Sequence, residues 1–191
     1  ADPFDALQDG ATRIASGPEL FAPERRNSEG FDLAHSPTLT RIAETRAPFQ
    51  SHQWHARPML AVPHSGSEVS LLRNPADSAD LVGQVTWANA ADVAAARGAA
   101  AMWEAEPEVR ADCLKKAADL YAAHFGELFA LLAREAGKTQ LDAVAELREA
   151  VDFLRYYAAN NQATRPAGVA LAISPWNFPL AIFTGQISAA L

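Results

Sequence analysis

The sequence predicts an α/β fold in which helices pack on an incomplete parallel sheet. Three observations support this class. The apolar run 168–173, closed by a following Pro, is typical of a short buried strand. The run 81–87 alternates apolar and polar residues, as a half-buried strand does. From Ala90 to about residue 160, apolar residues recur at the spacing of amphipathic helices.

Residues 1–75 are expected to be largely irregular and to precede the α/β part as a linker. A short helix is predicted over 3–15, and a charged loop rich in turn-forming residues follows over 17–30. Ser36-Pro37 favours another helix start, because Ser caps helices and Pro suits their first position. The apolar side of that helix would consist of Leu39, Ile42 and Ala43.

The segment 107–124 is the first of three predicted amphipathic helices, and it carries the only cysteine of the chain. Its apolar stripe would consist of Val109, Cys113, Ala117, Leu120 and Tyr121. A lone cysteine can be a nucleophile, but a position among apolar neighbours inside a helix favours a buried structural thiol. One cysteine also excludes an internal disulfide and fits a reducing compartment, so we expect a cytoplasmic protein.

Two further helices are predicted after this segment. The helix over 126–135 would end at Gly137, which suits a C-cap. Thr139 would cap the next helix, and on its outer face Arg148 and Asp152 are spaced to form an ion pair. Its inward side would carry Val144, Leu147, Val151 and Leu154.

Composition and charge exclude several classes of protein. The chain has 191 residues, of which 49% are hydrophobic, enough to bury a real core. Its net charge of −7 argues against a nucleic-acid partner, which would require a basic patch. No apolar run approaches a membrane span, and no signal-peptide pattern opens the chain. His52, His55 and His64 lack carboxylate or thiolate companions at helical spacing, so no metal site is predicted.

Asn177 is the strongest candidate for a functional side chain. It lies on the turn between the predicted strand 168–173 and a helix that would begin at Pro179. Open α/β sheets bind ligands at the carboxyl ends of their strands. A carboxamide fixed there can stabilise an oxyanion that develops on a carbonyl, and losing such a donor typically costs about 10²–10³ in rate. The alternative is an Asn that only satisfies its own turn.

The string Pro175-Trp-Asn-Phe-Pro179 resembles the matching segment of the NAD(P)-dependent aldehyde dehydrogenases. The order of segments also resembles the amino-terminal part of that fold, a helix-rich, Rossmann-like NAD-binding domain. The segments 134–139, 145–157 and 173–186 are similar to the L-glutamate γ-semialdehyde dehydrogenase part of bifunctional proline utilization A. Residues 18–33 resemble the linker from a preceding proline dehydrogenase, so the resemblance covers most of residues 18–191.

This resemblance implies roles for seven residues. Asn177 would donate to the oxyanion of a thiohemiacetal. Phe178 would pack against the aliphatic part of the substrate. Glu146 would reach the substrate pocket, while a solvated helix carboxylate stays the alternative for it. The NAD site would be lined by Ile173, Ser174, Pro175 and Trp176.

The resemblance also implies partners. The substrate would be a small aldehyde, and FAD would be present only with an upstream proline dehydrogenase domain. The family's nucleophilic Cys and general-base Glu would follow Leu191, so we expect a piece of a longer protein that does not turn over alone. The stretch 158–168 is shorter than the family's oligomerisation arm, so a homo-oligomer is expected of full-length relatives rather than of this chain.

Two other functions stay open at this point. One is an aldehyde dehydrogenase that acts on a different aldehyde. The other is a non-catalytic helical linker or docking module that ends in a similar turn.

Overall fold

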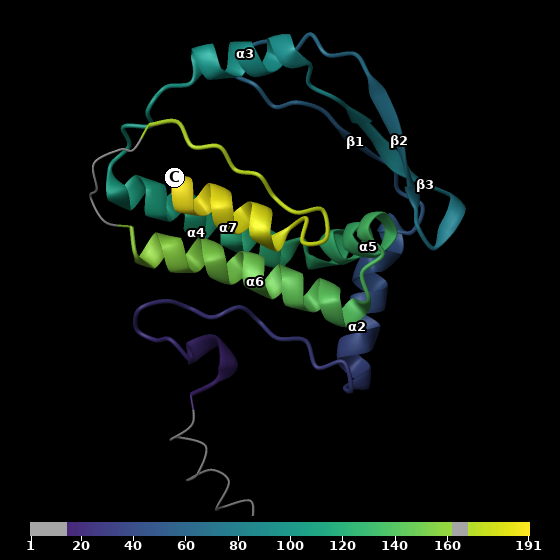
Figure 1. Cartoon of the computed structure of the whole chain (residues 1–191). Helices are drawn as coiled ribbons and strands as arrows, with labels where there is room; N and C mark the ends of the chain where they lie inside the picture. Colours follow the sequence, from purple (N-terminus) through teal and green to yellow (C-terminus); the bar gives the residue numbers. More distant parts are fainter. Residues whose placement is uncertain (1–14, 162–167) are drawn as a thin grey trace, which may run out of the picture.

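The computed structural model describes residues 15–161 and 168–191, so the helix predicted over 3–15 lies almost entirely outside the described residues. A layer of helices carries a small sheet at one end, and one further helix arches above the layer (Figure 1). The described elements, in chain order, are η2 (Gly17–Glu19), α2 (Ser36–Arg46), η3 (Ala47–Phe49), β1 (Trp54–Ala56), β2 (Val69–Asn74), β3 (Asp77–Thr86), α3 (Ala90–Ala99), α4 (Pro107–Ala123), α5 (Phe125–Ala136), α6 (Gln140–Ala159) and α7 (Ala181–Ala190). The predicted helix-rich α/β class is confirmed.

The sheet has the strand order β1-β3-β2. β3 confirms the strand predicted over 81–87, although it begins earlier, at Asp77. β1 runs parallel to β3, whereas β2 and β3 form an antiparallel hairpin, so the sheet is mixed rather than parallel. The hairpin turn is closed by Asn74, whose Oδ1 accepts the amide N–H of Ala76 at 2.9 Å. This hairpin crosses the boundary at residue 75, so the two predicted parts of the chain share one sheet.

The centre of the helical layer is α6, which packs against α4, α5 and α7. Its predicted inward side is confirmed, because Val144, Leu147, Val151 and Leu154 are each at most 6% exposed. Side chains from the neighbouring helices complete this core: Ile42, Ala111, Leu114, Ala118, Phe129 and Leu132. Burying a side chain of this size contributes about 1.5–3 kcal/mol, so the packing of α6 dominates the stability of the layer.

Two predicted caps fix the short connection between α5 and α6. Gly137 ends α5 in the left-handed conformation, with a φ of 65°, which only glycine adopts without strain. Thr139 caps α6, since its hydroxyl accepts the amide N–H of Asp142 at 3.2 Å. The backbone of Lys138 is therefore held from both sides.

The predicted apolar stripe of α4 is wrong for three of its five residues, whereas Ala117 and Tyr121 are half-buried and pack against the core. Val109 is 51% exposed, Leu120 is 47% exposed and Cys113 is exposed as well. The buried positions are instead Ala111, Leu114 and Ala118, which face α6. An alanine-rich helix presents two stripes of similar apolarity, and the one that faces a partner helix is buried.

Because Cys113 is exposed, we expect it to react with a thiol reagent in the native protein at the rate of an unfolded thiol. Cys113→Ser should change the free energy of unfolding by less than about 0.5 kcal/mol, as is usual for surface positions. Thiol titration with and without denaturant, together with urea unfolding of the variant, measures both effects. A thiol that reacts only after unfolding would contradict the orientation of α4.

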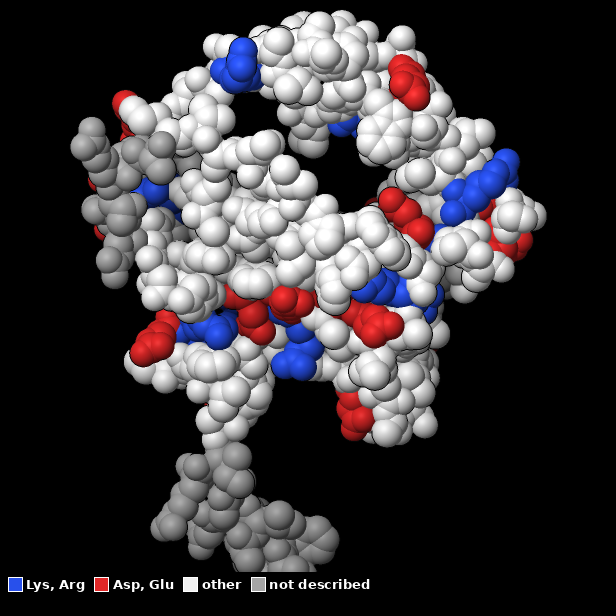
Figure 2. Space-filling view, in the orientation of Figure 1, with Lys and Arg blue, Asp and Glu red and all other residues white. Residues whose placement is uncertain are grey.

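A polar cluster fastens the segment before α2 to the outer face of α6. Asp152 accepts hydrogen bonds from Arg25 Nη1 at 3.2 Å and from the amide and hydroxyl of Ser28 at 2.9 and 2.7 Å. The predicted Arg148–Asp152 pair is therefore wrong, and Arg148 Nε donates to Ser28 Oγ at 3.3 Å instead. A surface pair of this spacing contributes only a few tenths of a kcal/mol, so contacts from a docked segment replace it. Charged side chains form a band over this region (Figure 2).

A second polar cluster joins α5 to the sheet. Arg134 is 7% exposed and forms a two-pronged ion pair with Asp80, at 3.0 Å from Nε and 2.6 Å from Nη2. Its Nη1 donates to the carbonyls of Phe49 and His52 at 3.0 and 2.6 Å. The guanidinium also lies 5.2 Å from the ring centroid of Trp54. We call this group the Arg134 hub.

Two carboxylates in the sheet region, Asp80 and Asp92, make the stability of the protein depend on pH under acidic conditions. Hydrogen bonds from Arg134 lower the pKa of Asp80 from 3.8 to about 2. Backbone N–H groups of Asn89 and Ser65 lower the pKa of Asp92 from 3.8 to about 2. Since both values fall on folding, these groups stabilise the protein fully above about pH 4, and this contribution is lost as the pH falls towards 2.

We therefore expect the urea midpoint of unfolding to drop between about pH 4 and pH 2. Asp80→Asn and Asp92→Asn should each flatten this drop, because the substituted group no longer binds a proton on unfolding. Equilibrium unfolding at a series of pH values measures the slope. A slope that neither substitution alters would contradict these pKa shifts.

Among residues 15–161 and 168–191, no helix is long and apolar enough to cross a membrane. The same residues include no group of three His, Cys, Asp or Glu side chains placed to hold a metal ion.

Candidate active site

The segment 168–173, predicted to be a buried strand, is extended but exposed. Val169, Leu171 and Ile173 are 72%, 84% and 76% exposed, and the segment pairs with none of the described strands. The prediction of a buried strand here is wrong. A strand requires a neighbour to complete its backbone hydrogen bonds, and this segment runs beside α7, away from the three-stranded sheet (Figure 1).

Gln186 attaches this segment to α7. Its Nε2 donates to the carbonyl of Ile173 at 3.1 Å, and its Oε1 accepts from the hydroxyl of Ser174 at 3.1 Å. The side chain of Gln186, rather than a neighbouring strand, thus bonds the backbone of Ile173 and the hydroxyl of Ser174. The sequence offered a signal for this contact, because Gln186 stands in the otherwise mostly apolar stretch 180–191.

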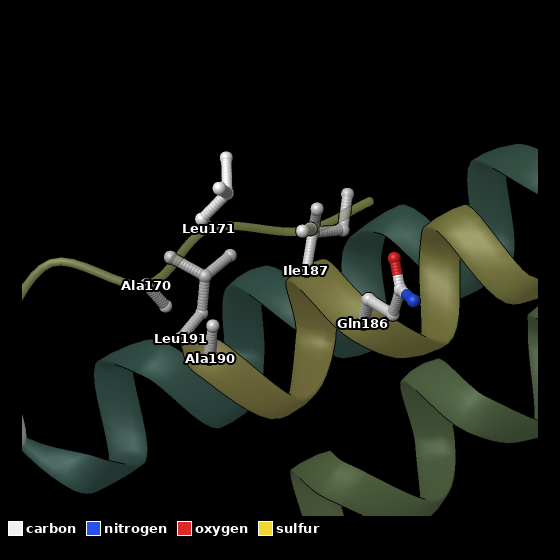
Figure 3. A pocket seen from close by; sticks show the side chains of 7 residues that line it. Ala170, Leu171, Gln186, Ile187, Ala190 and Leu191 are labelled. Carbon is white, nitrogen blue, oxygen red and sulfur yellow. The ribbon is translucent and has the colours of Figure 1, made fainter. Parts of the chain in front are cut away.

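A shallow apolar groove of about 420 Å³ lies between the segment and α7. Ile187 and Leu191 point from the end of the helix towards the segment, whereas the Leu171 side chain projects from the segment away from α7 (Figure 3). Residues 168–191 contain no charged side chain, and the surface above α7 is correspondingly uncharged (Figure 2). The groove therefore suits a flat, uncharged group rather than an ion.

The turn 176–180 connects the segment to α7, and it carries Asn177. Helix α7 begins at Ala181 with Leu180 as its N-cap, so the predicted helix start at Pro179 is two residues too early. The difference has a physical cause. The amides of Leu180 and Ala181 both donate to Glu146 Oε2 at 3.1 Å, so a carboxylate from α6 caps α7 from outside.

Glu146 is only 1% exposed, which excludes the alternative of a solvated helix carboxylate. Its Oε1 lies 2.9 Å from Lys138 Nζ, where the two charges meet outside hydrogen-bond geometry. The same ammonium lies 4.4 Å from the centroid of the Phe178 ring, which is within the range of a cation–π interaction. Lys138 therefore links two of the predicted site residues.

The structure brings Glu146 and Phe178 together beneath the turn, and Asn177 directly precedes Phe178. Asn177 and Pro175 are exposed, and Trp176 is 86% exposed, so the outer side of the turn is open to a ligand. Cys113, the only cysteine of the chain, lies on the exposed face of α4. The turn thus offers an amide donor and an aromatic surface, but no thiol.

Lys138 is the site residue that sequence reasoning missed. Its position between Gly137 and Thr139 was a usable signal, because two adjacent caps fix the direction of the side chain between them. The contact to Glu146 could not be predicted from spacing, since it depends on how the start of α6 faces the turn.

The aldehyde dehydrogenase family model matches residues 62–191, about two thirds of the chain. The chain belongs to the aldehyde dehydrogenase family. This confirms the family that the Asn177 string and the order of segments predicted. The match begins before β2 and includes the whole turn, α7 and the groove.

Relatives of this aldehyde dehydrogenase chain include the bifunctional protein PutA of Rhizobium meliloti, which is 44% identical over 187 residues. That match covers 94% of this chain and 15% of the relative, so the chain spans only a small part of the relative's length. The solved PutA of Bdellovibrio bacteriovorus has a TM-score of 0.74 at 25% identity, covering 92% of this chain and 20% of that one. The 1-pyrroline-5-carboxylate dehydrogenase from Thermus with bound NAD has a TM-score of 0.71 at 25% identity, covering 89% and 39%.

Proposed function

We propose that this chain forms part of the active site of a dehydrogenase that oxidises L-glutamate γ-semialdehyde to L-glutamate with NAD. The observation that carries this proposal is the anchored turn 176–180, which exposes Asn177 while Lys138 and Glu146 hold the residues after it. The names of the relatives, PutA and 1-pyrroline-5-carboxylate dehydrogenase, support the substrate.

In this proposal Asn177 stabilises the negative charge that develops on the aldehyde oxygen. A carboxamide N–H is effective in that role when it is aimed before the reaction begins, because no reorganisation is then needed. The contacts of the following residues support such a role, since Phe178 is held at its ring and Leu180 at its amide. The thiolate that attacks the carbonyl would come from outside this chain, because Cys113 lies on the exposed face of α4.

The residues of this chain fit part of a dinucleotide. The exposed segment from Ile173 to Trp176 and the apolar groove beside α7 offer surface for a flat ring. The first amides of α7 are already occupied by Glu146, so they are not available to a phosphate in the way that many helix starts are. NAD would supply the hydride acceptor for oxidation of the aldehyde carbon. We assign Ile173, Ser174, Pro175 and Trp176 to its orientation.

Phe178, which is 41% exposed, would contact the aliphatic part of the substrate with the ring face that Lys138 leaves free. Glu146 would shape the floor of the same pocket. Both of its oxygens are engaged, one by the amides of Leu180 and Ala181 and the other by Lys138. Direct contact between Glu146 and the substrate would require one of these partners to leave.

We further propose the setting that the PutA relatives suggest. Residues before about 75 would connect the dehydrogenase to a preceding FAD-dependent proline dehydrogenase, and the whole protein would be a cytoplasmic homo-oligomer. The cluster around Asp152 would then fix the direction in which the connecting segment approaches α6.

The test is NADH formation by the purified whole protein that contains this chain, because the chain alone is not expected to turn over. L-glutamate γ-semialdehyde is compared with propanal, which lacks the amino and carboxylate groups. We expect NADH with the first aldehyde and much less with the second. Hydrogen exchange of residues 169–173 with and without NAD is measured in parallel, and NAD is expected to slow it.

Three outcomes decide between the proposed function and its alternatives. Equal rates with both aldehydes would favour a dehydrogenase of different specificity. No NADH from either aldehyde, together with exchange that NAD does not change, would reject the enzyme and favour a docking module. Slower exchange with NADH from neither aldehyde would support the cofactor site and reject L-glutamate γ-semialdehyde as the substrate.

A further inference from the structure

We propose that Lys138 is a positioning residue for the turn that carries Asn177. This inference rests on the proposed function, in which the direction of Asn177 matters for the rate. It adds a residue to the site that contacts neither substrate nor cofactor in the arrangement described above. Four features of the structure support it.

The first feature is the fixed origin of the Lys138 side chain. Its amide donates to the carbonyl of Leu132 at 3.2 Å, and Gly137 and Thr139 cap the helices on either side. A Cβ placed on Gly137 would come within 3.1 Å of Pro75, so this connection is also packed against the hairpin turn. The backbone therefore does not need further ordering to aim the side chain.

The second feature is the enclosure of the ammonium group. The Lys138 side chain is 14% exposed and its partner, the Glu146 side chain, is 2% exposed. Removing the positive charge would leave a carboxylate buried without its counter-charge, which is strongly unfavourable. Lys138 thus supplies the counter-charge of the carboxylate that accepts both α7 amides.

The third feature is that Lys138 acts on both sides of Pro179. On the earlier side its ammonium faces the Phe178 ring at 4.4 Å. On the later side it holds Glu146, which receives the amides of Leu180 and Ala181. Lys138 therefore holds the turn on both sides of Pro179, and Asn177 directly precedes the first residue that it contacts, Phe178.

The fourth feature is the lack of other charges on the turn itself. Residues 168–191 contain no Lys, Arg, Asp or Glu, so the turn cannot form ion pairs through its own side chains. Its charged anchors come from the α5–α6 connection and from α6. Among the described residues, Lys138 and Glu146 are the charged groups in contact with it.

The experiment compares Lys138→Met with the wild type by hydrogen exchange and by kinetics, both in the whole protein that contains this chain. Met keeps the length of the side chain but removes its charge. We expect the amides of residues 176–184 to exchange about 10 times faster or more, with exchange in the core of α6 unchanged. We also expect kcat to fall by about 10- to 100-fold at constant KM for NAD, because Asn177 is then less well aimed. Lys138→Arg keeps the charge, so its exchange over 176–184 and its kcat should stay close to those of the wild type.

The matched control is Lys115→Met. Lys115 forms an exposed ion pair with Asp112 at 3.1 Å on α4. The variant therefore also loses an ammonium group, but at a position that does not contact the turn. It should leave exchange and kcat unchanged. If Lys138→Met does not fold, Lys138→Met combined with Glu146→Gln removes both buried charges and carries the same expectation for the turn.

Failure of this inference can be distinguished from failure of the proposed function. Unchanged exchange over 176–184, or faster exchange confined to 132–145, would overturn the positioning role and leave the function of Asn177 intact. Faster exchange over 176–184 in an enzyme whose kcat does not depend on Asn177 would reject the proposed oxyanion donor, while the role of Lys138 in holding the turn would stand.

Discussion

In the whole protein that contains this chain, replacing Asn177 with Ala is expected to lower kcat by about 10²–10³ and to leave the Kd for NAD nearly unchanged. The reason is that the carboxamide would act on charge that exists only in the transition state. Asn177 is exposed on the turn, so its truncation should cost little stability. Steady-state NADH formation and a separate NAD titration measure the two quantities.

Asn177→Asp sharpens this test because it keeps the size of the side chain and removes the N–H donors. It should lower kcat at least as much as Ala, since a carboxylate would also repel the developing oxyanion. Asn160→Ala is a suitable control, because Asn160 is an exposed amide at the end of α6 whose side chain donates to the carbonyl of Tyr156. A kcat that Asn177→Ala leaves unchanged would remove this residue from the mechanism.

The largest expected loss of stability comes from Arg134→Ala. This change would leave Asp80 without its partner and the carbonyls of Phe49 and His52 without their donor. The ion pair itself is only partly buried, since the Asp80 side chain is 24% exposed, so the loss comes mainly from acceptors left without a donor, at about 1–3 kcal/mol for each one that is buried. Urea unfolding of the wild type and variant at neutral pH measures the difference in free energy.

Two further variants make this prediction specific. Arg134→Lys keeps the charge but loses the two-pronged geometry, so it should recover only part of the stability. Lys115→Ala removes a cation from an exposed pair and should cost less than about 1 kcal/mol. Equal losses for Arg134→Ala and Lys115→Ala would show that the Arg134 hub is not a structural centre of the protein.

Local features of the fold could be predicted from the sequence where neighbouring residues determine them. The caps at Gly137 and Thr139 and the inward side of α6 depend on residues within a few positions of one another, and all are confirmed. The turn before β3 depends in the same way on Asn74.

Features set by distant residues were missed or predicted wrongly. On α4 the packing against α6 decided between two apolar stripes, so Cys113 was placed on the wrong face. The segment 168–173 has the composition of a strand, yet composition cannot supply the strand that would have to pair with it.

The candidate site likewise has a part that neighbouring residues determine and a part that distant residues determine. The string around Asn177 identified the turn and the family, because both are carried by consecutive residues. The anchors of the turn come from Glu146 and Lys138, which lie 30 to 40 positions earlier in the chain. No local sequence pattern predicts that a carboxylate on α6 caps α7.

The Arg134 hub also has a consequence for the order of events in folding. Its guanidinium joins residues that are 54, 82 and 85 positions away along the chain, so closing these loops carries a large entropic cost before any contact forms. Helices such as α6 can form from local contacts long before this happens. We therefore infer that the hub assembles after the main barrier, and that its loss would speed unfolding far more than it would slow folding. The lifetime of the native state, rather than the speed at which it is reached, would then depend on this one arginine.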